Sequence, residues 1–249
     1  MATKGCFMRI LNIFLLLIPF SSFANSGEQL VEQFFSPNGI DNKESVYIGE
    51  MLEHHLNDPT LGKNLSSDVS IKVRPLEKST KREIYAVLLT KNDQSIDWYI
   101  YLKKDKDKWK LSAVRKLALP GFLYMAIESQ KNNSNKTVEQ EYKYQNMLLI
   151  VKSDAELKKV LLDNIEDFQK LVHLKSDSNE IAKLTQKLNL NSVNKHINIG
   201  VVDISIGGIT DNSVGYFYVP TGSTVPRMSD DKYIYIEQIQ DNWYLYKTT

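Results

Sequence analysis

Alternation of apolar and polar positions marks two groups of segments along the chain. A period of two residues is typical of β-strands that bury one face. Short polar segments separate them, and these predict hairpin connections. The predicted strands are residues 69–74, 82–91, 96–104 and 109–117 in the first half, and 197–206, 214–219, 233–239 and 243–247 in the second.

Helical periodicity precedes each group of predicted strands. Residues 28–35 and 45–56 predict two short amphipathic helices before the first group. A second helical stretch follows Pro120, is interrupted by a polar linker, and continues to about residue 151. Ser153 then opens a capping box with Glu156, which predicts the start of a long amphipathic helix. A shorter helix is expected to end near Leu188.

The last two strands of each group repeat one motif. Tyr99-Ile100-Tyr101-Leu102, with Trp109 and Leu111, recurs 134 residues later (243 − 109 = 134) as Tyr233-Ile234-Tyr235-Ile236, with Trp243 and Leu245. Self-similarity at a fixed offset indicates an internal duplication. We therefore expect an α+β protein of two tandem similar modules, each with helices followed by a curved antiparallel sheet of about four strands. The expected bounds are 25–130 for the first module, 131–137 for a linker and 138–249 for the second module.

A helix-then-meander module that ends in a polar turn and Trp-x-Leu resembles a known fold. Trp109-Lys110-Leu111 and Trp243-Tyr244-Leu245 carry this resemblance, which is to the cystatin-like cone fold of the nuclear-transport-factor-two-like superfamily, including SnoaL-like proteins. The resemblance implies a cone-shaped sheet in each half. It transfers no catalytic residue, because folds of this type serve isomerases, dehydratases and non-enzymatic binding domains alike.

The first 24 residues read as a secretory signal peptide. Lys4 and Arg9 precede an apolar run over residues 10–20, and Ser22-Phe23-Ala24 offers small residues for cleavage after Ala24. An uncleaved anchor is the alternative, but the run is shorter than the roughly 20 residues needed to span a bilayer. Cys6, in the signal, is the single cysteine. A mature chain without cysteine favours a bacterial protein that is periplasmic or secreted.

Charge is balanced overall but unevenly distributed. Removing Lys4 and Arg9 from 31 basic residues leaves 29 against 30 acidic ones, which gives no nucleic-acid footprint. The first strand region is basic and the second is acidic. The interpretation we favour is that Lys103, Lys104 and their neighbours Lys106 and Lys108 solvate a hairpin and protect its edge. The alternative is electrostatic attraction between the modules or to an acidic partner.

No catalytic, cofactor or metal motif rises above chance. Glu50, His54 and Asp58 could share one helical face, but Pro59 interrupts the continuation, and a surface helix is the simpler interpretation. Ser192-x-x-Lys195 resembles the acylating serine motif of penicillin-binding enzymes, yet the partner motifs are missing. We predict no catalytic residue, no metal and no cofactor.

Tyrosine is concentrated in the second group of strands. Alternation places tyrosines that are two residues apart on one face of their strand. If the strands pair so that these faces coincide, the sheet carries a tyrosine surface whose area and hydroxyl groups would suit a protein partner. The same pattern is equally expected if tyrosine serves only as a good strand former, or if the modules bury these faces against each other. Arg227 lies in the longest predicted strand connection, residues 221–231, where recognition is expected. The candidate partner-binding residues are Tyr216, Tyr218, Tyr233, Tyr235, Tyr244, Tyr246 and Arg227.

These observations favour an exported, non-catalytic binding protein of the bacterial envelope. Its concrete form is an immunity protein or inhibitor that neutralises a secreted toxin or wall-degrading enzyme, so the expected partner is another envelope or secreted protein. After signal cleavage we expect no membrane span. The alternative is an enzyme or carrier of a small apolar ligand in a cone-shaped pocket, where Asp97, His196 and Asp203 would be inspected first. A structural envelope component that associates with itself is a third class.

Overall fold

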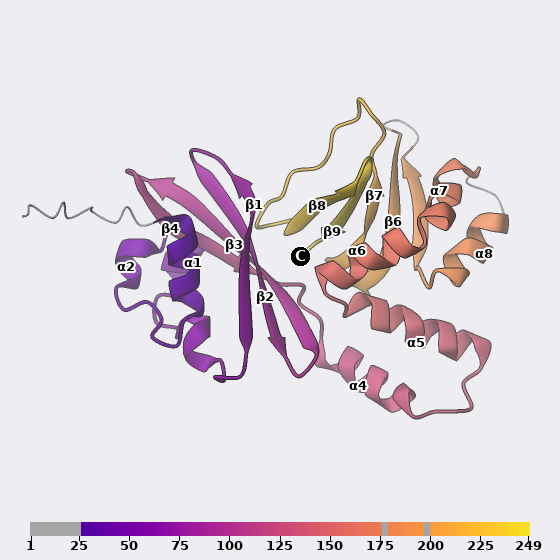
Figure 1. The fold of residues 1–249 in the computed structure, drawn as a ribbon, viewed down its shortest axis with the longest axis horizontal. Helices are drawn as coiled ribbons and strands as arrows, with labels where there is room; N and C mark the ends of the chain where they lie inside the picture. The colour runs from indigo at the N-terminus through magenta and orange to yellow at the C-terminus, as the bar shows by residue number, and fades with distance from the viewer. Residues whose placement is uncertain (1–25, 176–178, 197–199) are drawn as a thin grey trace, which may run out of the picture.

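The computed structural model describes residues 26–175, 179–196 and 200–249. The predicted α+β class is confirmed: helices and two antiparallel sheets form roughly two modules (Figure 1). The predicted signal peptide, residues 1–24, lies outside the described residues, as do residues 197–199 of one predicted strand. Within the described ranges, no helix is long and apolar enough to cross a membrane.

The first module is a helical N-terminal segment followed by a four-stranded meander. Its helices are α1 (Gly27–Phe35), α2 (Lys43–Val46), α3 (Glu50–His54) and the 3-10 helix η1 (Leu61–Asn64). Its strands are β1 (Ser70–Lys78), β2 (Arg82–Lys91), β3 (Gln94–Asp105) and β4 (Lys108–Arg115), in the order β1-β2-β3-β4. Two-residue turns at Asn92-Asp93 and Lys106-Asp107 have positive φ at both positions, which matches the twist of the hairpins.

Five helices precede the sheet of the second module. They are α4 (Gly121–Lys131), α5 (Val138–Ile150), α6 (Asp154–Asp163), α7 (Ile165–His173) and α8 (Asn179–Lys187). The strands are β5 (Ser192–His196), β6 (Val201–Ile209), β7 (Asn212–Tyr218), β8 (Tyr235–Gln240) and β9 (Trp243–Lys247), in the order β5-β6-β7-β9-β8. The predicted capping box at Ser153 is confirmed. Strand β5 is not predicted by the sequence pattern, because Ser-Val-Asn-Lys-His contains a single aliphatic residue.

The repeated hairpins occupy different places in their sheets. In the first module the tyrosine strand β3 is interior and the Trp109 strand β4 lies at the edge. In the second module β9, which carries Trp243, pairs with both β7 and β8, and the tyrosine strand β8 lies at the edge. The similarity in sequence therefore extends to the hairpin but not to the strand order.

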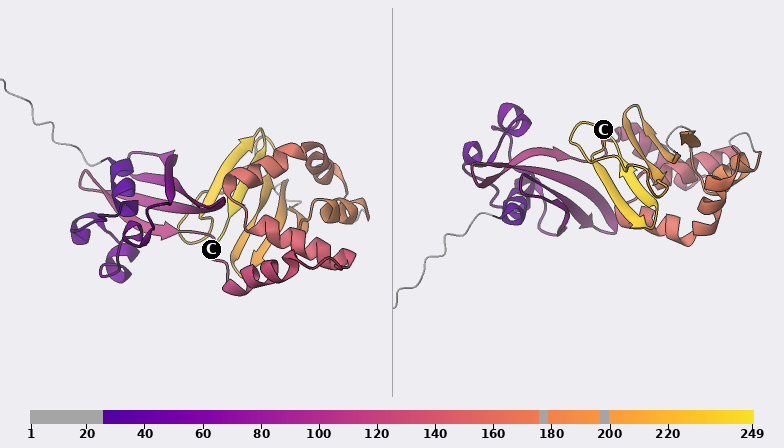
Figure 2. Two further views of the ribbon diagram at one scale, coloured as in Figure 1. Left: turned by 60° about the horizontal axis from the view of Figure 1, so that its bottom comes forward. Right: turned by 90° about the horizontal axis from the view of Figure 1, so that it is seen from above.

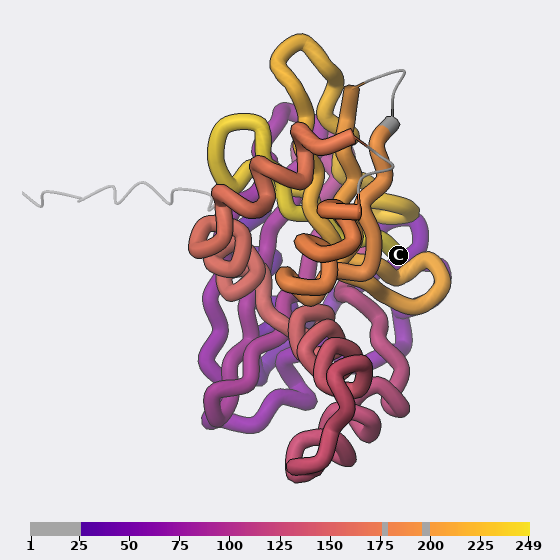
Figure 3. Tube along the Cα trace, turned by 90° about the vertical axis from the view of Figure 1, so that its right-hand side faces the viewer, coloured from indigo at the N-terminus to yellow at the C-terminus, as the bar shows by residue number. Residues whose placement is uncertain are grey.

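The first sheet is buried on both faces. One face, with Tyr85 and Ile100, packs on the N-terminal helices, where Leu30 and Phe35 of α1 are fully buried. The opposite face, which includes Tyr99, belongs to the same hydrophobic core as the second module. Figure 2 shows this sheet between its own helices and the second module, and Figure 3 looks onto the helices of the second module. The two modules therefore share one continuous core.

The polypeptide passes from the first sheet to the helices of the second module at residues 116–120. Residues 131–137, the predicted linker, connect α4 to α5, and these two helices contact each other. Leu123 and Ile127 of α4 are buried in the core that the two modules share. Helix α4, which the predicted bounds assign to the first module, therefore packs with the helices of the second.

The two hairpin tryptophans point toward helices, as alternation predicts. Trp243 and Leu245 are in the shared core, where the Trp243 ring meets Phe168 of α7 edge-on at 5.8 Å. Trp109 and Leu111 pack in the cluster beneath α1. Their burial differs, however: Trp243 is 2 % exposed, whereas Trp109 is half-buried at the sheet edge.

Replacing these tryptophans should therefore destabilise the protein to different extents. Trp243→Ala removes a fully packed indole, and we expect a loss of about 3–5 kcal/mol in the free energy of unfolding. Trp109→Ala should cost about 1–2 kcal/mol, because water already reaches its ring. Urea unfolding followed by circular dichroism measures both values. Tyr124→Ala, at an exposed position of α4, is the control and should change stability by less than about 0.5 kcal/mol. Equal losses for the two tryptophans would contradict this assignment.

Candidate functional site

The predicted tyrosine face is divided between two sides of the second sheet. Tyr216 and Tyr235 are in the shared core, and Tyr218 packs against it. Three others belong to a small cluster on the outer face, where Tyr246 is buried and Tyr233 and Tyr244 are half-buried. The tyrosine-bearing faces of the strands therefore do not coincide, which is the condition for a single tyrosine surface. Strand β8 begins at Tyr235 rather than Tyr233, so alternation does not continue back to Tyr233.

The buried tyrosine hydroxyl groups already have partners within the protein. Tyr216 donates to the carbonyl of Leu157 in α6 at 2.7 Å. Tyr246 donates to Asp203 Oδ1 at 2.7 Å, on the outer face of the sheet. Tyr216 and Tyr235 have no exposed surface. Neither is accessible to a partner in this structure.

The long connection from β7 to β8 docks onto the first module. Arg82 Nη1 donates to the carbonyl of Met228 at 3.1 Å, and Arg115 Nε donates to that of Asp230 at 2.7 Å. The Tyr101 hydroxyl donates to the carbonyl of Ile234 at 2.8 Å. The distal part of the same connection, with Arg227, is exposed. Much of the connection in which partner recognition is expected is therefore hydrogen-bonded to the first sheet of the same chain.

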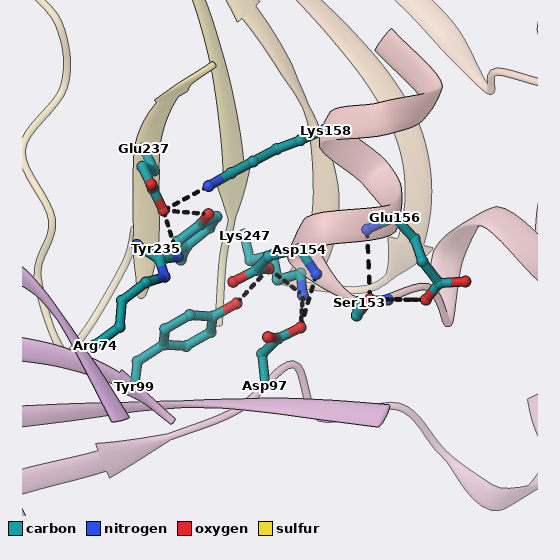
Figure 4. A network of polar contacts seen from close by, with 10 residues as sticks. All are labelled: Arg74, Asp97, Tyr99, Ser153, Asp154, Glu156, Lys158, Tyr235, Glu237 and Lys247. Carbon is teal, nitrogen blue, oxygen red and sulfur yellow. Dashed lines mark hydrogen bonds and ion pairs between the residues drawn. The ribbon is translucent and has the colours of Figure 1, made fainter. Parts of the chain in front are cut away.

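A buried cluster of charges lies where the two modules meet (Figure 4). Lys247 Nζ is 2.7 Å from Asp154 Oδ1 and 3.5 Å from Asp97 Oδ2. Asp97 Oδ2 also accepts the backbone N–H of Asp154 at 2.8 Å, and Tyr99 donates its hydroxyl to Asp154 Oδ1 at 2.8 Å. The exposed fractions of the three charged side chains are 5 % for Lys247, 7 % for Asp97 and 4 % for Asp154. We call Asp97, Asp154 and Lys247 the junction triad.

Local structure places each member of the junction triad. Lys247 is in phase with Trp243 and Leu245, so the alternation of β9 directs it to the buried face. Asp97 is likewise in phase with Tyr99 on β3. Asp154 is the first residue of α6, directly after the Ser153 cap, where a carboxylate is favoured by the helix dipole. Strand β3 of the first module and helix α6 of the second therefore bring their carboxyl groups to the ammonium group that β9 carries.

The electrostatics of the triad follow from its burial. Burial, reinforced by the neighbouring Asp154 carboxylate, raises the pKa of Asp97 above its ordinary value, although Lys247 opposes this. Burial alone would lower the pKa of Lys247, but the two carboxylates outweigh it and raise the value. Asp154 Oδ2 is buried and has no hydrogen-bond partner. The pKa values of Asp97 and Lys247 are therefore both raised.

A second charge cluster adjoins the triad through two stacked rings. Tyr99 and Tyr235 stack with their centroids 4.8 Å apart. The Tyr235 hydroxyl donates to Glu237 Oε2 at 2.7 Å. The same oxygen pairs with Arg74 of β1 at 2.6 Å and Lys158 of α6 at 2.8 Å. Burial raises the pKa of Glu237, but hydrogen bonds from its partners, first from Lys158, bring it below its ordinary value.

The structure contains ion pairs between the two modules. Such attraction is the less favoured interpretation of the charge distribution in the sequence. Arg74 pairs with Glu237 across the junction, and Lys103 lies 3.9 Å from Asp230. The favoured interpretation also holds in part, since Lys106 and Lys108 are exposed near the tip of the β3–β4 hairpin. The basic sheet therefore serves both purposes.

Two carboxylates, a lysine and a tyrosine would be a plausible set for acid–base catalysis in an open site. Here all four side chains are buried against each other. The other residues of the pocket hypothesis do not join them: Asp203 binds Tyr246 on the outer face, and the side chain of His196 lies outside the described residues. The arrangement joins the two modules, and its charged side chains are less than a tenth exposed.

The remaining motif candidates have structural roles. Glu50 pairs with Arg115, which lowers the Glu50 pKa through their hydrogen bond, and α3 ends at His54. Lys195 of β5 donates to the carbonyl of Val172 at the end of α7. In the part of the chain that the structure describes, no three potential ligands gather as a metal site.

An open groove of about 730 Å³ lies between α5, α8 and the start of β5. Its lining combines apolar residues with amides and hydroxyls. It includes Val138, Glu139 and Tyr142 of α5, Ile181, Ala182, Thr185 and Gln186 of α8 with Asn179, and Asn191, Ser192 and Val193. The sequence pattern does not indicate this groove, because it does not predict β5.

Comparison of the chain with protein-family models, curated proteins and solved structures finds no match. The resemblance to the cystatin-like cone fold therefore stays a prediction.

Removing the ammonium group should weaken the junction strongly. In Lys247→Met, an apolar side chain of similar length leaves two buried carboxylates facing each other, and we expect a loss of about 3–5 kcal/mol in unfolding free energy. The control is Lys159→Met, because Lys159 also pairs with an aspartate but is 73 % exposed. It should change stability by less than about 0.5 kcal/mol. If urea unfolding gives the two variants the same stability, the triad does not hold the modules together.

Proposed function

We propose that this chain is an exported, non-catalytic binding protein of the bacterial envelope, which neutralises a secreted toxin or wall-degrading enzyme as an immunity protein or inhibitor. One observation carries the proposal. The groups that could perform acid–base chemistry are enclosed in the junction, whereas a half-exposed aromatic surface remains on the outer face of the second sheet.

The proposed partner surface is what we call the outer patch: Tyr233, Tyr244 and Arg227. Tyr233 and Tyr244 pack against the buried pair Phe217 and Tyr246, whose rings stack at 4.1 Å. Their own positions are therefore fixed before a partner arrives, which reduces the entropy lost on binding. Arg227 adds an exposed cation on the adjoining loop. Tyrosine and arginine are enriched among residues that dominate binding energy.

The shared core supports this function because it holds the sheet that carries the outer patch against the first module. A preorganised surface binds a protein partner without the cost of ordering it first. Export through the predicted signal peptide would bring such a protein to the compartment where it meets secreted enzymes.

The proposal is tested by capture from envelope and secreted fractions with the chain lacking residues 1–24. A stoichiometric partner is expected. Tyr244→Ala and Arg227→Ala should each weaken its binding tenfold or more, which is about 1.4 kcal/mol. Tyr124→Ala, an exposed tyrosine on α4, is the matched control and should bind like the parent. Thermal melts confirm that each variant is folded. Failure to recover any partner, or equal loss with the control, would overturn the proposal.

The groove between α5 and α8 supports a second candidate function, carriage of a small apolar ligand. Val138, Ile181 and Val193 supply apolar lining, and Tyr142 borders it. An apolar fluorescent probe should then bind the parent and be lost in Val193→Asp, with no effect of Tyr244→Ala. Equal probe binding by Val193→Asp and the parent would exclude the groove as the carrier site.

A further inference from the structure

The junction triad contains more negative than positive charge. Lys247 brings one ammonium group, while Asp97 and Asp154 bring two carboxyl groups, and all three are less than a tenth exposed. The neighbouring cations are already used, since Arg74 and Lys158 both pair with Glu237. A net charge in such a place is costly, and proteins usually remove it by binding a proton.

Every element packed around Asp97 contributes to its environment. Histidine is not among the charges that act on Asp97 in the described ranges. The titratable groups that face it are Tyr99 from β3, Asp154 from α6 and Lys247 from β9, with Tyr235 of β8 behind Tyr99 and the Glu237 cluster beyond it. The proton that neutralises the excess negative charge is therefore bound by a member of the triad.

The distances favour Asp97 over Asp154 as the group that holds the proton. Asp154 Oδ1 has the closer ammonium, at 2.7 Å, and also accepts the Tyr99 hydroxyl. Asp97 Oδ2 has the ammonium at 3.5 Å and one backbone N–H. The closer donors therefore lie on Asp154, and a negative charge on Asp97 has the weaker compensation.

We propose that closing the two modules onto each other takes up one proton on Asp97, so that the junction is a latch that mild acid tightens and rising pH weakens. Burial and the Asp154 carboxylate raise the pKa of Asp97 in the folded protein, which agrees with this geometry.

The direction of the effect follows from comparing the folded and unfolded chains. In the unfolded chain Asp97 loses its proton near its ordinary value of 3.8. The folded protein keeps the proton to higher pH. The free energy of unfolding that this proton contributes is fully present below pH 3.8. It is lost as pH rises through the pKa of Asp97 in the folded protein. The hydrogen bond from Lys110 lowers the pKa of Asp105, a carboxylate nearer the surface. Groups of this kind have the opposite effect, because the stability they contribute is lost as pH falls, and only at acid pH.

The experiment is urea unfolding of the chain lacking residues 1–24 at pH 5, 6, 7 and 8, for the parent and Asp97→Asn. Asparagine keeps the shape and the oxygen that accepts the Asp154 N–H, but it cannot titrate. Against Asp97→Asn, the folding equilibrium constant of the parent should decline by up to tenfold per pH unit, the limit for one proton. At pH 8 the variant should be at least as stable as the parent. Every other residue is the same in both proteins, so the comparison isolates position 97.

Asp105→Asn is the matched control, because it removes a half-buried carboxylate of β3 that pairs with Lys110 outside the triad, and it should keep the pH profile of the parent. Parallel profiles for the parent and Asp97→Asn would overturn the proposal. If Asp97→Asn does not fold, carboxyl-carbon NMR of the parent decides the question. A neutral-acid signal for Asp97 at pH 6 supports the latch, and a carboxylate signal across pH 5–8 overturns it.

Discussion

The arrangement of the whole molecule depends on one buried ammonium group. Lys247 belongs to the last strand of the second module, yet its counterions come from β3 of the first module and from the start of α6. A buried ion pair is only weakly stabilising compared with apolar packing. Separating its charges inside the protein costs several kcal/mol, however, so the pair strongly disfavours other arrangements of the two modules. The triad therefore acts mainly by specifying how the two modules meet. The surrounding apolar contacts, which include the stacked Tyr99 and Tyr235, provide most of the stability.

Burial of the first sheet on both faces follows from this arrangement. A sheet in an α+β module normally exposes one face to water. Here the second face carries Tyr99 and Tyr101, whose hydroxyl groups both find partners in the second module. Arg82 and Arg115 extend the contact by capturing carbonyl groups of the β7–β8 connection. The outer face of the second sheet carries the separate cluster that includes Phe217 and Tyr246, and the proposed function is placed there.

Local patterns predict much of the fold, because alternation and capping act over a few residues. The strands of the first module, the Ser153 cap and the direction of both tryptophans follow directly from such patterns. Strand β5 does not, since tertiary pairing with β6 outweighs its polar composition. A single tyrosine surface does not form because the register pairs Tyr216 with Leu245 and Tyr218 with Trp243, and no local rule specifies that register.

The junction triad itself leaves a signal in the sequence. In Trp243-Tyr-Leu-Tyr-Lys247, the lysine occupies the same phase as tryptophan and leucine, and Asp97 occupies the same phase as Tyr99 and Tyr101. A charged residue in a core phase is unusual, and two of opposite sign suggest each other as partners. The positions of Asp154 and of the groove depend on tertiary packing, which no pattern along the chain encodes locally.

The sequence order of the triad has a consequence for how the protein is made. Residue 97 is synthesised first, residue 154 second and residue 247 much later. A growing chain therefore carries Asp97 and Asp154 as hydrated surface groups, and the face of the first sheet that holds Tyr99 stays uncovered until the second module has been completed. Closure of the junction is thus a late event in biogenesis, and until then the chain lacks the contact that joins its two halves.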